Sequence, residues 1–315
     1  MLKDFDPQRF IDEAIVRIKR DVGNQKAVVA LSGGVDSSVT AELGYRALKN
    51  KLIAVFLDDG LMREGEPEYV TKIFKDRGLN VKLHNVRDTF LTALKGISNP
   101  EDKRKVFRAT FYKVLSDFLK EVNAKFLLQG TIAADIVETV KGVKTQHNVL
   151  SQIGIDPLRE YGFKIIEPLS NLYKNQVRMV AEALKLPKEI IERKPFPGPG
   201  LSVRIIGEVT AERIDIVRKA TKIVEDETKD IPCFQAFAVL MNDKATGLSQ
   251  EGGRKYGEII VIRIVDSIDA MTAKPTQIPW DILERINKRI IEALPSVTRV
   301  LYDITSKPPA TIEFE

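Results

Sequence analysis

The stretch Lys26–Ser38, which reads KAVVALSGGVDSS, holds the residues best suited to bind an anion. Apolar β-formers at 27–31 predict a strand, two glycines predict a tight turn, and a segment of helical composition follows at Val39–Lys49. The N–H groups of such a turn and the positive end of the helix dipole converge on one point, where a phosphate can bind. Asp36 is unusual there, because a carboxylate beside a phosphate is favourable chiefly when a divalent cation bridges the two.

This loop differs from the two most familiar phosphate-binding motifs. The sequence contains no GxxxxGK[ST], which excludes a Walker loop, and no GxGxxG, which excludes a dinucleotide fingerprint. A bare Ser-Gly-Gly could equally be an ordinary turn with a helix N-cap. The strand before it, the Asp-Ser-Ser after it and the helix beyond favour phosphate binding instead.

Strands and helices alternate around the loop. Strands are predicted at 27–31, 52–57, 81–86, 126–128 and 165–169, and helices at 5–22, 39–49, 65–77, 90–120 (interrupted near Asn99) and 175–186. This alternation predicts an α/β fold with a parallel sheet covered by helices on both faces. Ligands of such sheets bind at the carboxyl ends of strands, so Asp58-Asp59-Gly60 and Gln129-Gly130-Thr131 should share one crevice with the loop.

A dense group of prolines and glycines, KPFPGPG at 194–200, predicts a domain boundary. We therefore expect a first domain at 1–193, a linker at 194–202 and a smaller α+β domain at 203–315. In the latter, strands are predicted at 203–209, 235–240, 259–265 and 300–305, and helices at 211–229 and 280–294.

Two further segments lack a clear period. The irregular stretch 141–154 is either a plain surface excursion or a mobile lid. The final residues 307–315 read KPPATIEFE. Polar tails usually fray, but the prolines and apolar side chains here make a docked tail at least an equal alternative.

Composition limits the class of protein. At 315 residues, 43% hydrophobic and 30% charged, the chain is long enough for two domains with cores, and no apolar run or signal peptide predicts a membrane location. Its one cysteine, Cys233, excludes an internal disulfide and fits a reducing cytoplasm. The net charge of +5 suits nucleic acid or phosphorylated substrates. We expect no nucleic-acid binding, because the sequence has no RNP-type aromatic pattern and no GXXG loop in a basic setting.

SGGVDSS resembles the pyrophosphate-binding loop of the N-type ATP pyrophosphatases, which cleave ATP to AMP and pyrophosphate while adenylating a second substrate. Further segments resemble the ATP pyrophosphatase and dimerisation portions of the GMP synthetases, in order and over nearly the whole chain. These segments are LDDGLMR (57–63), QGTI (129–132) with Asp135, QHNV (146–149), EPL (167–169), PFPGPGL (195–201) and the terminal nonapeptide. The resemblance implies an adenine nucleotide alpha hydrolase-like domain followed by an α+β dimerisation domain.

The implied activity is that of a ligase forming a C–N bond. ATP adenylates the C2 oxygen of XMP, ammonia displaces it, and GMP, AMP and pyrophosphate result. Too few residues precede the first strand for a glutaminase domain, and Cys233 lacks a nucleophile-elbow context. The chain therefore resembles the two-subunit form, in which a separate glutaminase subunit supplies ammonia, and the family's second domain implies a homodimer.

The resemblance also implies the site residues. ATP would contact Ser32, Gly33, Gly34, Val35, Asp36, Ser37, Ser38, Phe56, Leu57 and Gly130, and Mg²⁺ would bind Asp36 and Asp135. XMP would contact Arg63, Lys307, Ile312 and Glu313, to which we add Arg204. Asp36 would act in catalysis together with one lid lysine, either Lys141 or Lys144.

The chain departs from the family pattern at three places. The lid is shorter and reads Lys144-Thr145-Gln146-His147-Asn148, which leaves the choice of lid lysine open. Lys194 stands where the family commonly has histidine, and Ala133-Ala134 replace a Tyr-Pro pair. Alternative functions are another ATP pyrophosphatase, similar to NAD synthetase or to a tRNA-modifying enzyme, and a nucleotide-binding module without turnover.

Overall fold

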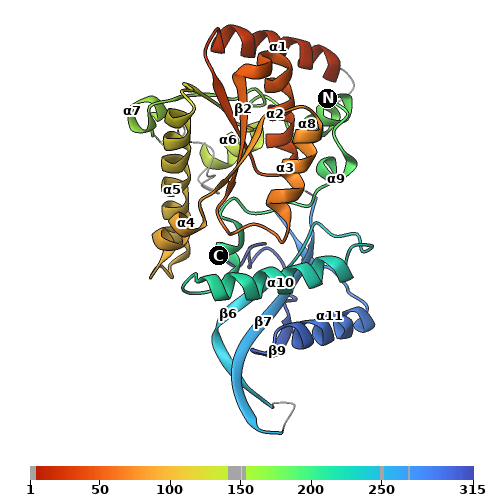
Figure 1. Ribbon diagram of the computed structural model, residues 1–315. Helices are drawn as coiled ribbons and strands as arrows, with labels where there is room; N and C mark the ends of the chain where they lie inside the picture. Colours follow the sequence, from red (N-terminus) through yellow and green to blue (C-terminus); the bar gives the residue numbers. More distant parts are fainter. Residues whose placement is uncertain (1–4, 141–149, 151–153, 249–251, 269) are drawn as a thin grey trace. The chain divides into compact units, whose positions relative to one another are not determined.

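The computed structural model describes residues 5–140, 150, 154–248, 252–268 and 270–315 (Figure 1). The chain forms two compact units. The first unit comprises Met1–Asp58, Gly65–Val86 and Arg108–Arg193, and the second comprises Asp59–Glu64, Arg87–Phe107 and Lys194–Glu315. Each unit is thus built from several separate stretches of the chain. The predicted bounds 1–193 and 203–315 describe two continuous domains and remain a prediction.

A five-stranded parallel sheet forms the centre of the first unit. Its order is β3 (Val81–Asn85), β2 (Leu52–Asp58), β1 (Ala27–Leu31), β4 (Phe126–Leu128), β5 (Lys164–Ile166). All of β2 is buried, as expected for an apolar strand covered on both faces. The predicted parallel sheet is confirmed, and because the strand order reverses at β1, the ligand crevice should lie between β1 and β4.

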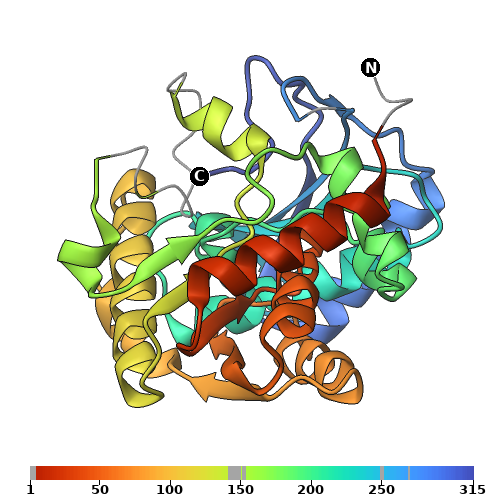
Figure 2. The same ribbon diagram turned by 90° about the horizontal axis from the view of Figure 1, so that it is seen from above.

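Helices cover both faces of this sheet. They are α1 (Pro7–Val22), α2 (Val35–Leu48), α3 (Glu66–Asp76), α6 (Ala133–Val140), α7 (Pro157–Tyr161), α8 (Lys174–Ala183), α9 (Lys188–Ile191) and the later part of α5 (Pro100–Glu121), with a short 3-10 turn η1 (Lys49–Lys51). Asp6 caps α1 by accepting from the N–H groups of Gln8 and Arg9 at 2.9 and 3.1 Å. Helix α1 lies against α2 and α8 (Figure 2), and its buried residues include Ile11, Ala14 and Ile18.

A second sheet organises the second unit. Strands β6 (Gln235–Leu248) and β7 (Arg254–Asp266) are antiparallel, β8 (Lys274–Pro275) extends the sheet, and β9 (Val297–Tyr302) pairs with β7 in parallel. Helices α10 (Ala211–Glu227) and α11 (Trp280–Ala293) pack beside each other and against the sheet, and α4 (Arg87–Leu94) also belongs to this unit. The described residues include no helix long and apolar enough to cross a membrane.

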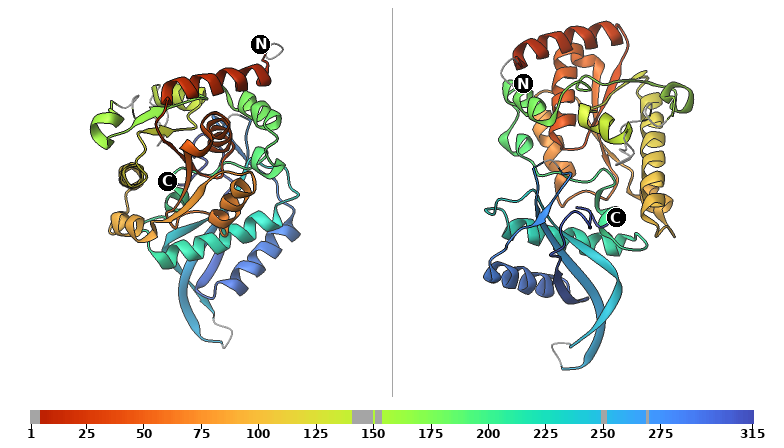
Figure 3. Two further views of the ribbon diagram at one scale, coloured as in Figure 1. Left: turned by 45° about the horizontal axis from the view of Figure 1, so that its top comes forward. Right: turned by 180° about the vertical axis from the view of Figure 1, so that it is seen from behind.

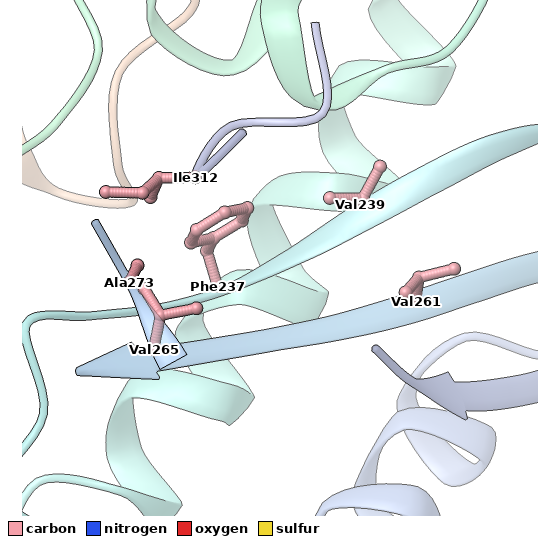
Figure 4. Packing of buried hydrophobic residues seen from close by; sticks show 6 residues of the cluster. All are labelled: Phe237, Val239, Val261, Val265, Ala273 and Ile312. Carbon is pink, nitrogen blue, oxygen red and sulfur yellow. The ribbon is translucent and has the colours of Figure 1, made fainter. Parts of the chain in front are cut away.

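The tail closes the core of this sheet on the face away from α10. Ile312 is only 8% exposed and packs into a cluster with Phe237, Val239, Val265 and other buried side chains (Figure 4). These strand residues project from the same face toward Ile312. This burial confirms the docked alternative for the tail. Burying the Ile312 side chain stabilises the docked position by about 1.5–3 kcal/mol.

The strand predicted at 203–209 is wrong. Residues Gly200–Arg204 form a 3-10 helix, η3, and only Ile205 makes a single bridge, to Leu240. Gly200 has φ +61°, and a Cβ there would lie 2.5 Å from the carbonyl oxygen of Leu61, so the backbone turns tightly at this point. Leu201, Val203 and Ile205 are buried without extended pairing, which explains why the composition of this stretch resembled that of a strand.

Two strands of this unit are longer than predicted. β6 continues past Leu240 to Leu248, and β7 begins at Arg254, so the two form a long hairpin that projects past α11 (Figure 3). Polar residues from Asn242 onward lie outside the predicted strand, but in the outer half of the hairpin Lys244 is paired with Glu258 at 3.2 Å.

Candidate active site

The loop after β1 is a tight connection to α2. β1 ends at Leu31 and α2 begins at Val35, four residues earlier than predicted, so Asp36 and Ser37 lie in the first helical turn. Gly34 is the N-cap and offers no side-chain hydrogen bond to the first-turn N–H groups. These donors, at the positive end of the helix dipole, are therefore available to an anion.

Serine hydroxyls brace this loop from within. Ser37 Oγ accepts from the N–H of Ser32 at 3.2 Å, lies 2.9 Å from Ser32 Oγ and donates to the carbonyl oxygen of Gly34 at 3.1 Å. The next hydroxyl, Ser38 Oγ, is buried and has no hydrogen-bond partner among the described residues. The loop thus keeps its shape without a ligand and retains unused polar atoms.

Two glycines allow close approaches around the loop. Gly33 has φ +73°, and a Cβ there would lie 2.1 Å from Nη1 of Arg193, which donates to the Gly33 carbonyl oxygen at 2.9 Å. A Cβ on Gly130 would lie 2.8 Å from the backbone carbon of Asp36. The residues after β4 therefore touch the first turn of α2, as the predicted crevice requires.

The two carboxylate oxygens of Asp36 have different surroundings. Oδ2 accepts from Nζ of Lys174, the first residue of α8, at 2.5 Å, whereas Oδ1 is buried and has no hydrogen-bond partner among the described residues. Burial raises the pKa of the Asp36 carboxyl, Lys174 partly opposes this, and the negative charge of Asp135 adds to it. A buried oxygen left unsatisfied beside a second carboxylate suits a cation that prefers oxygen ligands.

The protein alone would not complete a cation site here. Within the described part of the chain, no group of three or more His, Cys, Asp or Glu side chains could hold a metal ion. Asp135 Oδ2 already accepts from the N–H of Ile132 at 3.1 Å. A cation bound by Asp36 and Asp135 would therefore take its other ligands from phosphate and water, which is the usual arrangement for Mg²⁺.

The end of β2 provides backbone rather than side chains. Phe56 pairs with Leu31 across the sheet, and its ring is fully buried in the core, as is nearly all of Leu57. Only main-chain atoms of these two residues could reach a ligand at the strand end. The lid lysines, Lys141 and Lys144, lie outside the described residues.

A second cluster of predicted residues forms within the second unit. Arg204, 1% exposed, donates from Nε and Nη2 to the two carboxylate oxygens of Glu313, both at 2.9 Å. Its guanidinium lies 4.0 Å from the ring centroid of Phe237 and 5.0 Å from that of Phe196. Arg63 covers the same Phe196 ring at 4.4 Å. Arg63, Arg204 and Glu313 thus come together with Phe196; we call these four residues the acceptor cluster.

Buried cations hold the tail that supplies Glu313. Arg263, fully buried, contacts Asp303 Oδ2 at 3.0 Å and the carbonyl oxygens of Thr305 and Thr311 at 2.5 and 3.0 Å. Lys103, also fully buried, donates to the carbonyl oxygen of Ile205 at 2.6 Å and to the carboxylate of Glu315. The tail is therefore fixed on both sides of Glu313.

Lys307 takes a different position. Its ammonium donates to the carbonyl oxygen of Ala270 at 2.8 Å, and its main chain forms both hydrogen bonds of a bridge with Ala273. No contact within the described residues connects its side chain to the Arg204–Glu313 pair. The sequence placed Lys307 beside that pair only through the shared tail motif.

Several residues around the acceptor cluster and around the loop after β1 were not predicted from the sequence. In the second unit, Gln235 Nε2 donates to the carbonyl oxygen of Pro195 at 2.9 Å and to Glu313 Oε1 at 3.3 Å. In the first unit, Lys174 and Arg193 contact Asp36 and Gly33. Phe196 lay within a quoted motif, but nothing in the periodicity distinguished the others from surface or strand-end polar residues.

Comparisons with known proteins cover nearly the whole chain. The family model described as the PP-loop domain matches residues 7–187, and the model described as the GMP synthase C terminal domain matches 221–314. The B subunit of glutamine-hydrolyzing GMP synthase from Methanocaldococcus jannaschii is 49% identical over 99% of this chain and 100% of its own length. The protein of the same name from Archaeoglobus fulgidus is 51% identical over 98% and 100%. A solved structure of NMN synthetase from Francisella tularensis aligns with 93% of this chain and 96% of that chain at 16% identity, with a TM-score of 0.49.

Proposed function

This chain belongs to the family of GMP synthase B subunits, and we propose that it converts XMP to GMP by activating the C2 oxygen with ATP. One observation supports this most strongly: the tail residue Glu313 is held by the buried Arg204 and lies among aromatic and cationic side chains. A general ATP-binding protein has no need for such a cluster in its second unit. The cluster supplies a guanidinium donor and a carboxylate acceptor for a polar, planar acceptor molecule.

In this proposal the first unit binds ATP. Main-chain and hydroxyl groups of the loop residues 32–38 hold the β- and γ-phosphates, and Gly130 with the main chain of Phe56 and Leu57 flanks the adenosine. Lys174 and one of the lid lysines, Lys141 or Lys144, offset the negative charge that collects on the departing pyrophosphate. The chain therefore acts mainly by positioning and charge neutralisation.

Asp36 and Asp135 hold Mg²⁺ in this scheme. When bound, Mg²⁺ neutralises charge on the phosphates and supports their departure as pyrophosphate. Asp36 Oδ1, buried and without a partner among the described residues, supports its role as a ligand. Lys174 would serve as the counter-ion of Asp36 when no cation is bound.

XMP binds at the acceptor cluster, with Arg63, Arg204 and Glu313 around it, whereas Lys307 and Ile312 hold the tail from positions outside the cluster. Its C2 oxygen attacks the α-phosphorus of ATP, and the bond to pyrophosphate breaks. Ammonia then adds to C2, and the C2–O bond breaks so that AMP leaves with that oxygen and GMP remains. Holding both substrates in place is the main contribution of the chain to these two steps.

The ammonia comes from a separate glutaminase chain, in keeping with the designation of the relatives as B subunits. We further expect a homodimer formed through the second unit. The chain's single cysteine is compatible with a reaction that takes place in the cytoplasm.

The test measures pyrophosphate release from Mg-ATP and ammonium chloride, with and without XMP, for the wild type and Asp36→Ala. We expect release that requires XMP, yields GMP and falls by about 10³-fold or more in the variant, as for loss of a central electrostatic group. Release that ignores XMP but responds to another acceptor would transfer the chain to a different ATP pyrophosphatase reaction. Full activity of Asp36→Ala would remove the metal role of Asp36.

A further inference from the structure

Two short chain segments connect the phosphate loop to the acceptor cluster. One runs from Arg63 to Glu66 and the other from Arg193 to Phe196, and each crosses from one compact unit to the other. Each segment has one end residue in the first unit and one in the second. The two segments contact each other within both units, through a different pair of side chains in each.

In the first unit the pair is Glu66 with Arg193. Arg193 Nη2 lies 2.5 Å from Glu66 Oε1, and the two side chains are 17% and 2% exposed. The other terminal nitrogen, Nη1, donates to the Gly33 carbonyl oxygen at 2.9 Å. Because the peptide group is planar and trans, fixing this carbonyl directs the N–H of Gly34 to the opposite side. Arg193 therefore sets the orientation of a peptide in the phosphate loop.

In the second unit the pair is Arg63 with Phe196. The guanidinium lies 4.4 Å from the ring centroid, and Nη2 lies 3.5 Å from the carbonyl oxygen of Lys194. Gln235 also fixes this segment through its 2.9 Å hydrogen bond to the Pro195 carbonyl oxygen. Arg63 Nε also donates to Glu225 Oε1 at 2.7 Å, so a ligand that displaces this pairing lets the guanidinium shift against Phe196 of the second segment.

The segments limit how far their ends can move apart. Three successive residues span at most about 11 Å when fully extended, so the Cα atoms of Arg63 and Glu66, and those of Arg193 and Phe196, stay within that distance. A ligand changes a second site only through contacts that differ between two states, and here the contacts of Arg63 are those that an acceptor molecule would change.

We infer that the paired segments 63–66 and 193–196 couple acceptor binding to the phosphate loop, with Arg193 as the positioning residue. Binding of XMP raises the affinity for Mg-ATP, and by reciprocity ATP raises the affinity for XMP by the same factor. This inference rests on the proposed function, because XMP is taken as the ligand of the acceptor cluster.

The experiment compares dissociation constants measured by calorimetry. Mg²⁺ with α,β-methylene-ATP, which cannot release pyrophosphate, is titrated into the protein with and without saturating XMP. For the wild type we expect XMP to lower the Kd of the analogue at least about fivefold. In Arg193→Met the ratio should fall below about twofold, while the Kd for XMP alone stays unchanged. Arg193→Lys keeps the charge but cannot bond Glu66 and Gly33 with one rigid fork, so its ratio should be intermediate.

Arg77→Met is the matched control. Arg77 also pairs with a buried glutamate of the first unit, Glu42, at 3.0 Å, and it donates to the carbonyl oxygens of Leu184 and Lys185. It touches neither the loop nor a crossing segment in the contacts described. Its loss should lower the melting temperature as much as that of Arg193 but leave the ratio of dissociation constants unchanged.

The outcomes separate the two ideas. If wild-type protein binds no XMP either alone or with the ATP analogue, and makes no GMP, the proposed function fails. If it binds XMP and makes GMP but the ratio is one, or if Arg193→Met and Glu66→Gln retain the wild-type ratio, the coupling is overturned and the function stands. Should Arg193→Met fail to fold, Arg193→Lys and Glu66→Gln decide the question, because both keep a polar side chain of similar length, and a wild-type ratio in both overturns the coupling.

Discussion

At the scale of single residues, the second unit relies on buried charges that need their partners. Arg204 is 1% exposed and its bidentate contact with Glu313 is supported by the faces of Phe196 and Phe237. A buried charge whose partner is removed costs far more than the pair itself contributes, because the desolvation penalty is then uncompensated. The pair therefore ties the tail to the rest of the unit more firmly than its net energy suggests.

We expect Glu313→Ala to lower the free energy of unfolding by about 3–5 kcal/mol, since it leaves the Arg204 guanidinium buried without its carboxylate. The double variant Arg204→Met/Glu313→Ala should recover part of this loss. Urea unfolding monitored by circular dichroism measures both. The exposed pair Lys288–Glu292, at 4.0 Å, provides the control, because Lys288→Met should change stability by less than about 0.5 kcal/mol. If the loss of unfolding free energy in the double variant equals the sum of the losses in Arg204→Met and Glu313→Ala, the proposed pairing is contradicted.

The buried Lys103 should make the stability of the protein depend on pH. Its side chain is fully buried, and burial lowers its pKa below the ordinary 10.5, although Glu315 opposes the shift. Between the lowered folded pKa and 10.5 the unfolded chain binds more protons than the folded chain, so stability due to this group rises with pH in that window. Below the folded pKa both states are protonated and the contribution is flat.

The measurement is the difference in unfolding free energy between wild type and Lys103→Met across about pH 7 to 10, the window below the ordinary lysine pKa. We expect this difference to grow in favour of the wild type as the pH approaches 10.5, from the direction of the shift. A difference that shrinks on the alkaline side would show that Lys103 is instead stabilised as a cation.

At the scale of elements, the contact between β4 and α2 sets the geometry of the phosphate loop. Gly130 follows β4, and any Cβ there would lie 2.8–3.0 Å from main-chain atoms of Asp36 and Ser37. These atoms belong to the first helical turn and cannot move away without displacing the loop. We expect Gly130→Ala to lower kcat/KM for ATP by about 10²-fold, as for an approximately 1 Å misplacement of a reacting group.

Gly162→Ala is the control for Gly130→Ala. Gly162 also lies in the first unit, but its φ of +79° and open surroundings mean that the substitution strains the backbone without touching the loop. It should lower the melting temperature and leave kcat/KM within about twofold. Equal catalytic losses for the two variants would mean that general destabilisation, and not the β4–α2 contact, limits activity.

Most elements follow from local patterns in the sequence. The strands Ala27–Leu31 and Phe126–Leu128 have the predicted bounds because short runs of apolar β-formers are flanked by polar or breaking residues. The local pattern did not predict the secondary structure where contacts between distant segments determine it. Residues 201–205 alternate apolar and polar side chains yet form no strand. The polar outer half of the β6–β7 hairpin is extended because the two strands pair with each other.

The candidate site was likewise predicted where its residues belong to local motifs and missed where residues distant in sequence contribute. The glycines and serines of the loop are local signals, and Arg63, Arg204 and Glu313 follow from motifs. Lys174 and Arg193 reach the loop from residues more than 130 positions away, and no local pattern indicates such a contact. Burial of the Phe56 ring likewise depends on the sheet that surrounds it.

At the scale of the whole molecule, the interleaved units have a consequence for the tail. Residues 312–315 supply Ile312 to the core of the second unit and the carboxylates of Glu313 and Glu315 to Arg204 and Lys103. They contact only residues of the second unit in the bonds described here, and the first unit binds ATP with its own loop in our proposal. Loss of the tail should therefore affect the two substrates unequally.

We expect removal of residues 312–315 to abolish XMP-dependent pyrophosphate release while the Kd of Mg²⁺ with α,β-methylene-ATP, without XMP, changes by less than about threefold. Two buried cations would lose their carboxylates, so the free energy of unfolding should fall by several kcal/mol, about 3–5 for each pair if the losses were additive. Calorimetry and a pyrophosphate assay on the truncated chain test this, with the melting temperature confirming that folded protein is present at the assay temperature. Because the truncation removes Glu313 but leaves Arg63, Phe196 and the whole phosphate loop, equal loss of both ligands would mean that the first unit cannot hold its loop without the second. In that case ATP binding would be a property of the whole molecule and not of the parallel sheet alone.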